Sequence, residues 1–319
     1  MTAFPIRKPV ELEQRPATQH WLVDTLWGEQ AVGILGGDPK TGKTFMALDI
    51  AIAVASGQPC LRHYPVQTPG PVLLYAAEDA PHIVRARLEG IAHAAGTRFD
   101  TLDIAVIDTP VMRLDDADHR QQLANTVNHV RPRLIILDPL VRLHSRDENA
   151  AGEIAPILAF LRTLQRSFAT AVLLVHHARK SGGNRPGKAL RGSGELFAWT
   201  DSLAFLQRRK QRIFMTLEHR AAPSHDDIEL ELVTLQHGPA LRRLEANGSP
   251  PPDTTPQDTI IQLLKNTDTP LSLRQIRERA GVRNATVSTT LKHLCSTHRV
   301  IHSRHGYTIN RDQPELPFA

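Results

Sequence analysis

Short apolar runs recur along the chain between about residues 21 and 244, and segments with helical spacing separate them. Nearly unbroken runs of this kind are typical of strands buried on both faces of a mainly parallel sheet, with the intervening helices covering those faces. The pattern therefore predicts an α/β domain over residues 21–246. Its predicted strands are Ala31–Leu35, Val72–Ala76, Ile104–Ile107, Leu134–Leu137, Ala171–Val175 and Ser202–Gln207.

The hydrophobic pattern changes after this domain. Residues 247–257 are rich in Pro, Ser, Thr and Gly and predict a semi-rigid linker. Three helical segments and an alternating stretch around a Gly follow within residues 258–311, with Ser272 as the expected N-cap of the second helix. This order resembles a small winged helix-turn-helix domain. We expect residues 1–20 to form an irregular arm and residues 312–319 a flexible tail.

A glycine loop lies between the first predicted strand and an apolar helix that ends at Gly57. It fits the pattern G-x-x-x-x-G-K-[ST], in which backbone N–H groups and a helix N-terminus surround phosphates. Lys43 would neutralise the β- and γ-phosphates, and the Thr44 hydroxyl would ligate Mg²⁺. The sequence thus predicts ATP and Mg²⁺ as cofactors. The expected nucleotide-binding residues are Gly37, Asp38, Pro39, Lys40, Thr41, Gly42, Lys43 and Thr44.

Carboxylates follow two of the other predicted strands. Asp138 ends the run Leu134–Leu137 and is the expected second residue of the metal site, together with Thr44. Glu78 follows Val72–Ala76 and is the expected general base for the attacking water. Asp79 is the alternative base, or the N-cap of the next helix.

The strand Ala171–Val175 leads into His176 and His177. We expect His177 to contact the γ-phosphate and His176 to pack. A long basic loop follows at residues 180–194, in which Lys188 and Arg191 could grip a phosphate backbone. The alternative for this segment is a solvated basic loop.

The composition narrows the class of partner and the compartment. The 319 residues carry a formal net charge of +5, which favours an anionic partner. Aromatic residues make up only 5%, which disfavours a base-stacking sheet surface. Cys60 and Cys295 lack metal-ligand spacing, and no apolar run has the length of a membrane span. We therefore expect a soluble cytoplasmic protein with no membrane partner.

The order of P-loop, Glu78, Asp138 and His177, followed by an Arg-Gly-Ser loop, resembles the RecA-like ATPases of the plasmid RepA helicase type. These are hexameric replicative helicases related more distantly to the DnaB and KaiC groups, and the resemblance covers residues from about 21 to 220. It implies a RecA-like core, a homohexameric ring, and ATP held between adjacent subunits.

The resemblance also implies an arginine finger from the neighbouring subunit. Arg220 is the first candidate, and Arg191 and Arg208 are the alternatives. Relatives often carry Lys-x-Arg at this place, whereas Glu218 stands here in the position of the Lys. If no finger serves, the protein would be a weak ATPase or a nucleotide-gated clamp.

The C-terminal segments suggest further partners. In a winged helix, the third helix and the wing would contact duplex DNA, although such domains also serve as protein-interaction modules. The last residues are similar to short peptides that dock on the bacterial sliding clamp. The expected DNA contacts in this domain are Asn284, Thr286, Thr289, Lys292 and Arg304.

The leading hypothesis is a ring-forming, ATP-hydrolysing, DNA-dependent ATPase, namely a RepA-type replicative helicase of a plasmid or other mobile element. Single-stranded DNA would pass through the ring. The alternatives are an ATP-gated DNA-binding regulator and a recombination mediator, both without helicase activity.

Overall fold

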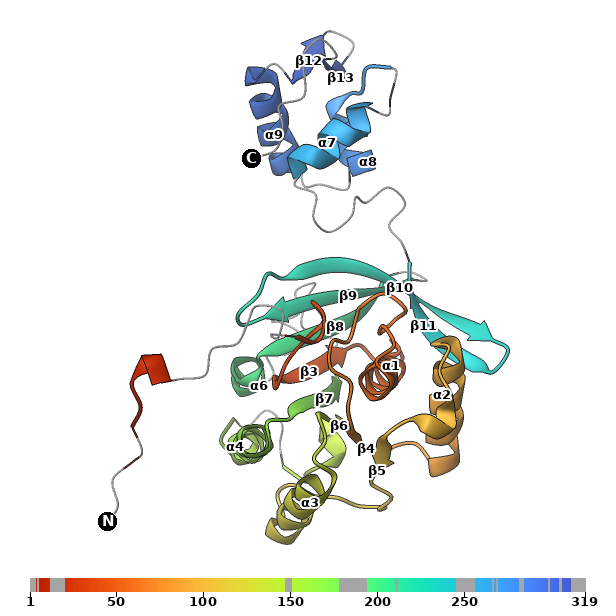
Figure 1. The fold of residues 1–319 in the computed structure, drawn as a ribbon, viewed down its shortest axis with the longest axis vertical. Coiled ribbons are helices and arrows are strands. Elements are labelled where there is room, and N and C mark those ends of the chain that lie inside the picture. The colour runs from red at the N-terminus through yellow and green to blue at the C-terminus, as the bar shows by residue number, and fades with distance from the viewer. Residues whose placement is uncertain are drawn as a thin grey trace. The chain divides into compact units, whose positions relative to one another are not determined.

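The computed structural model describes residues 4, 6–11, 21–146, 151–177, 194–209, 212–244, 256–265, 267, 269–280, 284–297, 299–303 and 306–310. The chain forms two compact units, Met1–Leu244 and Glu245–Ala319 (Figure 1).

A nine-stranded sheet organises the N-terminal unit. Its strands, in their order across the sheet, are β11 (Gly238–Arg243), β10 (His225–Leu235), β9 (Arg212–His219), β8 (Ser202–Arg209), β3 (Val32–Gly37), β7 (Ala171–His177), β6 (Leu134–Asp138), β4 (Val72–Ala76) and β5 (Ile104–Val106). All pairings from β8 to β5 are parallel, and those from β8 to β11 are antiparallel. The predicted α/β fold with a mainly parallel sheet is confirmed.

The antiparallel strands β10 and β11 were not predicted. They lack a continuous apolar run, because Glu229, Glu231 and Arg242 alternate with their buried positions. Such alternation is expected where one face of a sheet meets solvent, and it gives a weaker signal than the parallel strands do.

Helices cover both faces of the sheet. The helices α1 (Lys43–Ser56) and α2 (Pro81–Ala94) pack on one face, and α3 (Ala117–Val130) and α4 (Ala151–Phe168) pack on the other. The alternation in β6 shows this division, because Leu134 and Ile136 belong to the first core and Ile135 and Leu137 to the second. A short helix, α6 (Gly194–Trp199), precedes β8.

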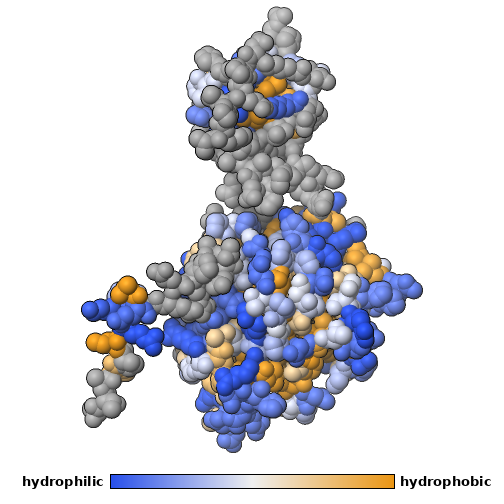
Figure 2. Space-filling model, in the orientation of Figure 1, coloured by the Kyte–Doolittle hydropathy of each residue, from blue (hydrophilic) through white to orange (hydrophobic). Residues whose placement is uncertain are grey.

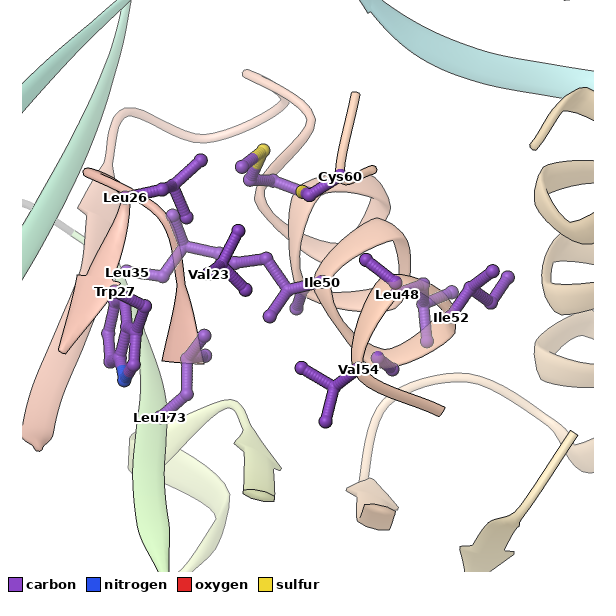
Figure 3. Close-up of a cluster of buried hydrophobic side chains, with 14 of the residues drawn as sticks. Val23, Leu26, Trp27, Leu35, Leu48, Ile50, Ile52, Val54, Cys60 and Leu173 are labelled. Carbon is purple, nitrogen blue, oxygen red and sulfur yellow. The ribbon is translucent and has the colours of Figure 1, made fainter. Parts of the chain in front are cut away.

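Helix α1 is the central element of the first core, since 10 of its 14 residues are buried. Figure 3 shows its side chains beside those of the hairpin formed by β1 (Trp21–Val23) and β2 (Trp27–Gly28). The helix ends at Gly57 in a left-handed conformation (φ 76°), as the sequence predicted. A helix packed on so many sides holds its N-terminus, and the loop before it, in a fixed position.

The C-terminal unit contains three helices and a two-stranded hairpin, in the order predicted. These are α7 (Pro256–Lys265), α8 (Leu273–Ala280), α9 (Asn284–Ser296), β12 (Val300–Ser303) and β13 (Gly306–Ile309). Ser272 caps α8 as expected, because its hydroxyl accepts from the Gln275 N–H at 3.3 Å while the Gln275 side chain accepts from the Ser272 N–H at 2.9 Å. No helix in the described part of the chain is long and apolar enough to cross a membrane.

Candidate nucleotide site

The glycine loop links β3 to the N-terminus of α1. Gly37 has φ 148°, and a Cβ built there would lie 2.1 Å from the Leu206 carbonyl oxygen, so no other residue fits this close approach to β8. Gly42 is the N-cap of α1 with φ 87°, and α1 has no side-chain cap and no acidic residue in its first turn. The first N–H groups and the positive end of the helix dipole are thus left for an anion.

Lys43 is the cation of this loop and is only 4% exposed. Its Nζ donates to the carbonyl oxygens of Gly37 at 3.0 Å and Asp38 at 2.7 Å. Burial lowers the pKa of Lys43 to about 8, although the negative charges of Asp138, Asp38 and Glu78 oppose this shift. The ammonium is therefore held over the loop in a poorly solvated place, where it attracts phosphate strongly.

Asp138 ends β6 and is 7% exposed, and the Thr44 hydroxyl hydrogen-bonds to its carboxylate. Burial raises the pKa of Asp138 to about 6, and the nearby negative charges of Asp79 and Glu78 add to this. Hydroxyl and carboxylate oxygens are the ligands that Mg²⁺ prefers beside substrate phosphates. The donor set of Thr44 and Asp138, within a cluster of carboxylates, therefore fits Mg²⁺.

Glu78 lies beyond the end of β4, whose Ala76 is in register with Asp138. Two groups face its carboxylate: the Arg142 Nε donates to Oε1 at 3.0 Å, and the His177 Nε2 lies 3.9 Å from Oε2. Glu78 is partly exposed, so water can reach it. This placement at the carboxyl edge of the sheet suits a base that acts on water.

His177 ends β7 in register with Gly37 of the P-loop, whereas His176 is buried and packs, as expected. Asp79 does not cap α2. The N-cap of that helix is Ala80, with no side-chain cap, and Asp79 forms an ion pair with Arg87 instead. The prediction of an Asp79 cap is wrong because Pro81 begins the helix one residue later than the cap required.

Arg142 was not found by sequence reasoning. It lies in the 3₁₀ turn η4 (Leu140–Arg142) that follows Asp138. A basic residue four positions after a strand-end Asp is a signal that could have drawn attention to it. Its partner, Glu78, is 64 residues away in sequence, so only the pairing of β4 with β6 brings the two together.

The candidate finger residues lie in different places. Arg208, at the end of β8, donates to the Lys40 carbonyl oxygen at 3.0 Å and so supports the P-loop of its own chain. Arg220 lies beside the start of β8, where it pairs with Asp201 at 3.2 Å and donates to the Ala198 carbonyl at 2.6 Å. Arg191 lies outside the described residues.

The remaining predicted contacts are placed only in part. Asn284, Thr286, Thr289 and Lys292 lie on α9. Lys188 and Arg304 lie outside the described residues.

The fold and the loop together define a P-loop nucleotide-binding domain. Residues 5–183 match the AAA domain family, and the chain belongs to this family. A solved structure of a viral-size comparison, described as an ATPase domain, is similar over 68% of this chain and 86% of its own, with 18% identity and a TM-score of 0.52.

A second solved structure shows the same fold. It is titled "The Structure Of A DnaB-Like Replicative Helicase And Its Interactions With Primase", and it matches 66% of this chain at 16% identity and a TM-score of 0.51. The match covers 57% of that helicase chain, so the present protein corresponds to part of its length. The expected RecA-like P-loop ATPase fold is confirmed at this level.

Proposed function

We propose that the protein is a ring-forming, ATP-hydrolysing DNA helicase of the plasmid RepA type. The observation that carries the proposal is the meeting of Lys43, Glu78, Asp138 and His177 at the carboxyl ends of β3, β4, β6 and β7. The likeness to a DnaB-like replicative helicase supports the choice of a helicase among P-loop ATPases.

Each side chain has a role that follows from its position. Lys43 and the α1 N-terminus hold the phosphates, and Thr44 with Asp138 would hold Mg²⁺, which neutralises charge on the transferred phosphoryl group when bound. Glu78 accepts a proton from the attacking water, and Arg142 keeps its carboxylate oriented. His177 contacts the γ-phosphate and transmits its presence to the basic loop that follows β7.

A neighbouring subunit completes the site in this proposal. Arg220 lies beside Asp201, whose N–H donates to the Val32 carbonyl at the start of β3, while the P-loop follows the other end of that strand. Five residues of strand separate the two ends, about 17 Å. Arg220 therefore cannot act on its own P-loop, and a head-to-tail ring, a hexamer in this proposal, would bring it to the next one.

DNA is the proposed partner at two places. Single-stranded DNA would pass through the ring against Lys188 and Arg191. Duplex DNA would contact a winged helix formed by the C-terminal unit, through Asn284, Thr286, Thr289, Lys292 and Arg304. Residues 312–319 would dock on the sliding clamp, and the protein would act in the cytoplasm.

Unwinding of a forked DNA by the full chain, with ATP and Mg²⁺, tests the proposal. Lys43→Ala should abolish nucleotide binding, and Glu78→Gln should retain binding while slowing hydrolysis by about 10²-fold or more, since it removes the base. Glu89→Gln, at a position of α2 outside the site, is the matched control. Full ATPase activity of Lys43→Ala would overturn the site; hydrolysis without unwinding, but with ATP-dependent protection of duplex DNA, would indicate a regulator.

A further inference from the structure

A cavity of about 510 Å³ lies in the N-terminal unit, and its lining includes no residue of the P-loop. It is enclosed by α2, the 3₁₀ turn η3 (Phe99–Thr101), β5 and the segment after β4. Most of its lining is apolar, and Asp79 and Asp108 are its acidic residues. The apolar lining includes Val84, Leu88, Phe99, Leu102, Ile104 and Val106.

The cavity lies at an open edge of the sheet. β5 is the last strand in the sheet order and pairs only with β4 among the described strands. Such an edge presents backbone N–H and C=O groups that can pair with another extended segment. Val106, on this strand, is 44% exposed, and Figure 2 shows hydrophobic patches that interrupt the hydrophilic surface of the unit.

The N-terminal arm has the complementary character. Phe4 and Ile6 are each 93% exposed, and Val10, in the 3₁₀ turn η1 (Pro9–Glu11), is 82% exposed. A single chain thus leaves both apolar arm and apolar cavity uncovered, an arrangement typical of surfaces that meet a partner.

The spacing of the arm residues suits an added strand. Phe4 and Ile6 are two residues apart, so in an extended segment their side chains point to the same face and their N–H groups to the same edge. The intervening Pro5 lacks an N–H, but it would direct that position away from the paired edge. Arg7 and Lys8 add two positive charges that complement the acidic residues of the cavity.

We propose that Phe4 and Ile6 of one copy of this chain enter the α2–β5 cavity of the next copy, with the arm extending the sheet at β5. This rests on the proposed homo-oligomer. Arm and cavity are different patches of one chain, so their pairing is head-to-tail, and head-to-tail contacts are those that close into rings. Asp79 of the cavity follows Glu78 directly, which would link occupancy of the cavity to the hydrolytic site.

Crosslinking tests the pairing and its direction. Phe4→Cys and Val106→Cys are made separately in the full chain carrying Cys295→Ser, with the buried Cys60 retained, and one of the two carries a size tag. After mixing with ATP and Mg²⁺, a short bismaleimide should give a covalent dimer that contains both variants. Phe4→Cys with Leu232→Cys is the matched control, because Leu232 is 43% exposed but lies on β10, outside the cavity.

The double variant Phe4→Cys/Val106→Cys separates the two possible occupants. A ladder of covalent multimers supports docking on a second copy. Modification of both cysteines within a chain of monomer mass would mean that the arm enters its own cavity, and absence of the mixed dimer would mean that the arm does not dock; both results overturn the proposal.

Sedimentation gives an independent readout. Phe4→Ser/Ile6→Ser should weaken self-association by about tenfold or more, whereas Leu232→Ser should not. Oligomers that hydrolyse ATP but assemble normally without the two arm side chains would refute the docking alone. A wild-type chain that neither associates nor hydrolyses ATP would refute the proposed function itself.

Discussion

Replacing Lys43 by Met should make the N-terminal unit more stable while abolishing nucleotide binding. Burial lowers the pKa of Lys43 to about 8 from its usual 10.5, so folding must desolvate a cation. The difference between these two pKa values corresponds to roughly 3 kcal/mol of destabilisation. Met has a similar length and no charge, and it avoids that cost.

Part of this gain is lost with the hydrogen bonds. The Lys43 ammonium donates to two carbonyl oxygens, and their loss costs about 1 kcal/mol or somewhat less for each. The net expectation is that Lys43→Met raises the free energy of unfolding by about 1 to 2 kcal/mol at pH 7. Stability gained by removing a functional group is a recurrent trade-off at binding sites.

The sign of the pH dependence follows from the lowered pKa of Lys43. Below about pH 8 the side chain is charged in both folded and unfolded chains, so the full cost is present. Between about pH 8 and 10.5 the folded chain has released the proton and the unfolded chain has not, so the cost shrinks as pH rises. The stability difference between the variant and the wild type should therefore be constant below about pH 8 and should decline above it.

Urea unfolding without nucleotide, followed by tryptophan fluorescence, measures this effect. All three tryptophans, Trp21, Trp27 and Trp199, lie in the N-terminal unit, so the signal reports that unit. Lys40→Met, at an exposed position of the same loop, should change nothing. A Lys43→Met variant that is equally or less stable at pH 7 would show that burial of the ammonium is fully compensated.

Three further predictions concern activity. The kcat/KM for MgATP should fall above about pH 8 as Lys43 loses its proton, a range in which ATP itself does not titrate, and a Lys43→Arg variant that still turns over should lack this limb, so its persistence there would assign the limb to another group. Asp138→Asn should raise the Mg²⁺ concentration needed for half-maximal activity by about tenfold, measured by magnesium titration near neutral pH, and an unchanged requirement would remove Asp138 from the metal site. Arg142→Gln should lower kcat by about three- to fivefold with KM nearly unchanged, since an exposed ion pair contributes at most about 1 kcal/mol to the orientation of Glu78; steady-state kinetics that show no loss would deny it a positioning role.

The predictable part of the fold consists of elements whose signal is local. The runs that became β3, β4, β6, β7 and β8 are apolar on both faces, and their sequence alone identifies buried parallel strands. β10 and β11 alternate charged with buried residues, so their signal depends on which face the rest of the protein covers. Asp79 shows a similar limit, because a carboxylate before a helix can cap it or pair with a distant Arg87, and only the folded chain decides.

The candidate site divides in the same way. The Gly37–Thr44 loop follows from sequence, because a P-loop needs a contiguous set of residues between a strand and a helix. Its partners Glu78, Asp138 and His177 could be proposed from sequence because each ends an apolar strand. The contact of Arg142 with Glu78 could not, since it depends on β4 and β6 being neighbours in the sheet.

The sequence by itself therefore determined the α/β class, the P-loop and the strand-end residues, all of which are short-range patterns of burial and backbone conformation. Only the tertiary structure decided which strand ends meet, that Arg208 supports its own P-loop, and that Arg220 lies at the opposite edge of the sheet. It also revealed the open edge at β5 and the cavity beside α2. The physical reason is strand order, because the pairing of segments far apart in sequence sets these distances and no local pattern encodes it.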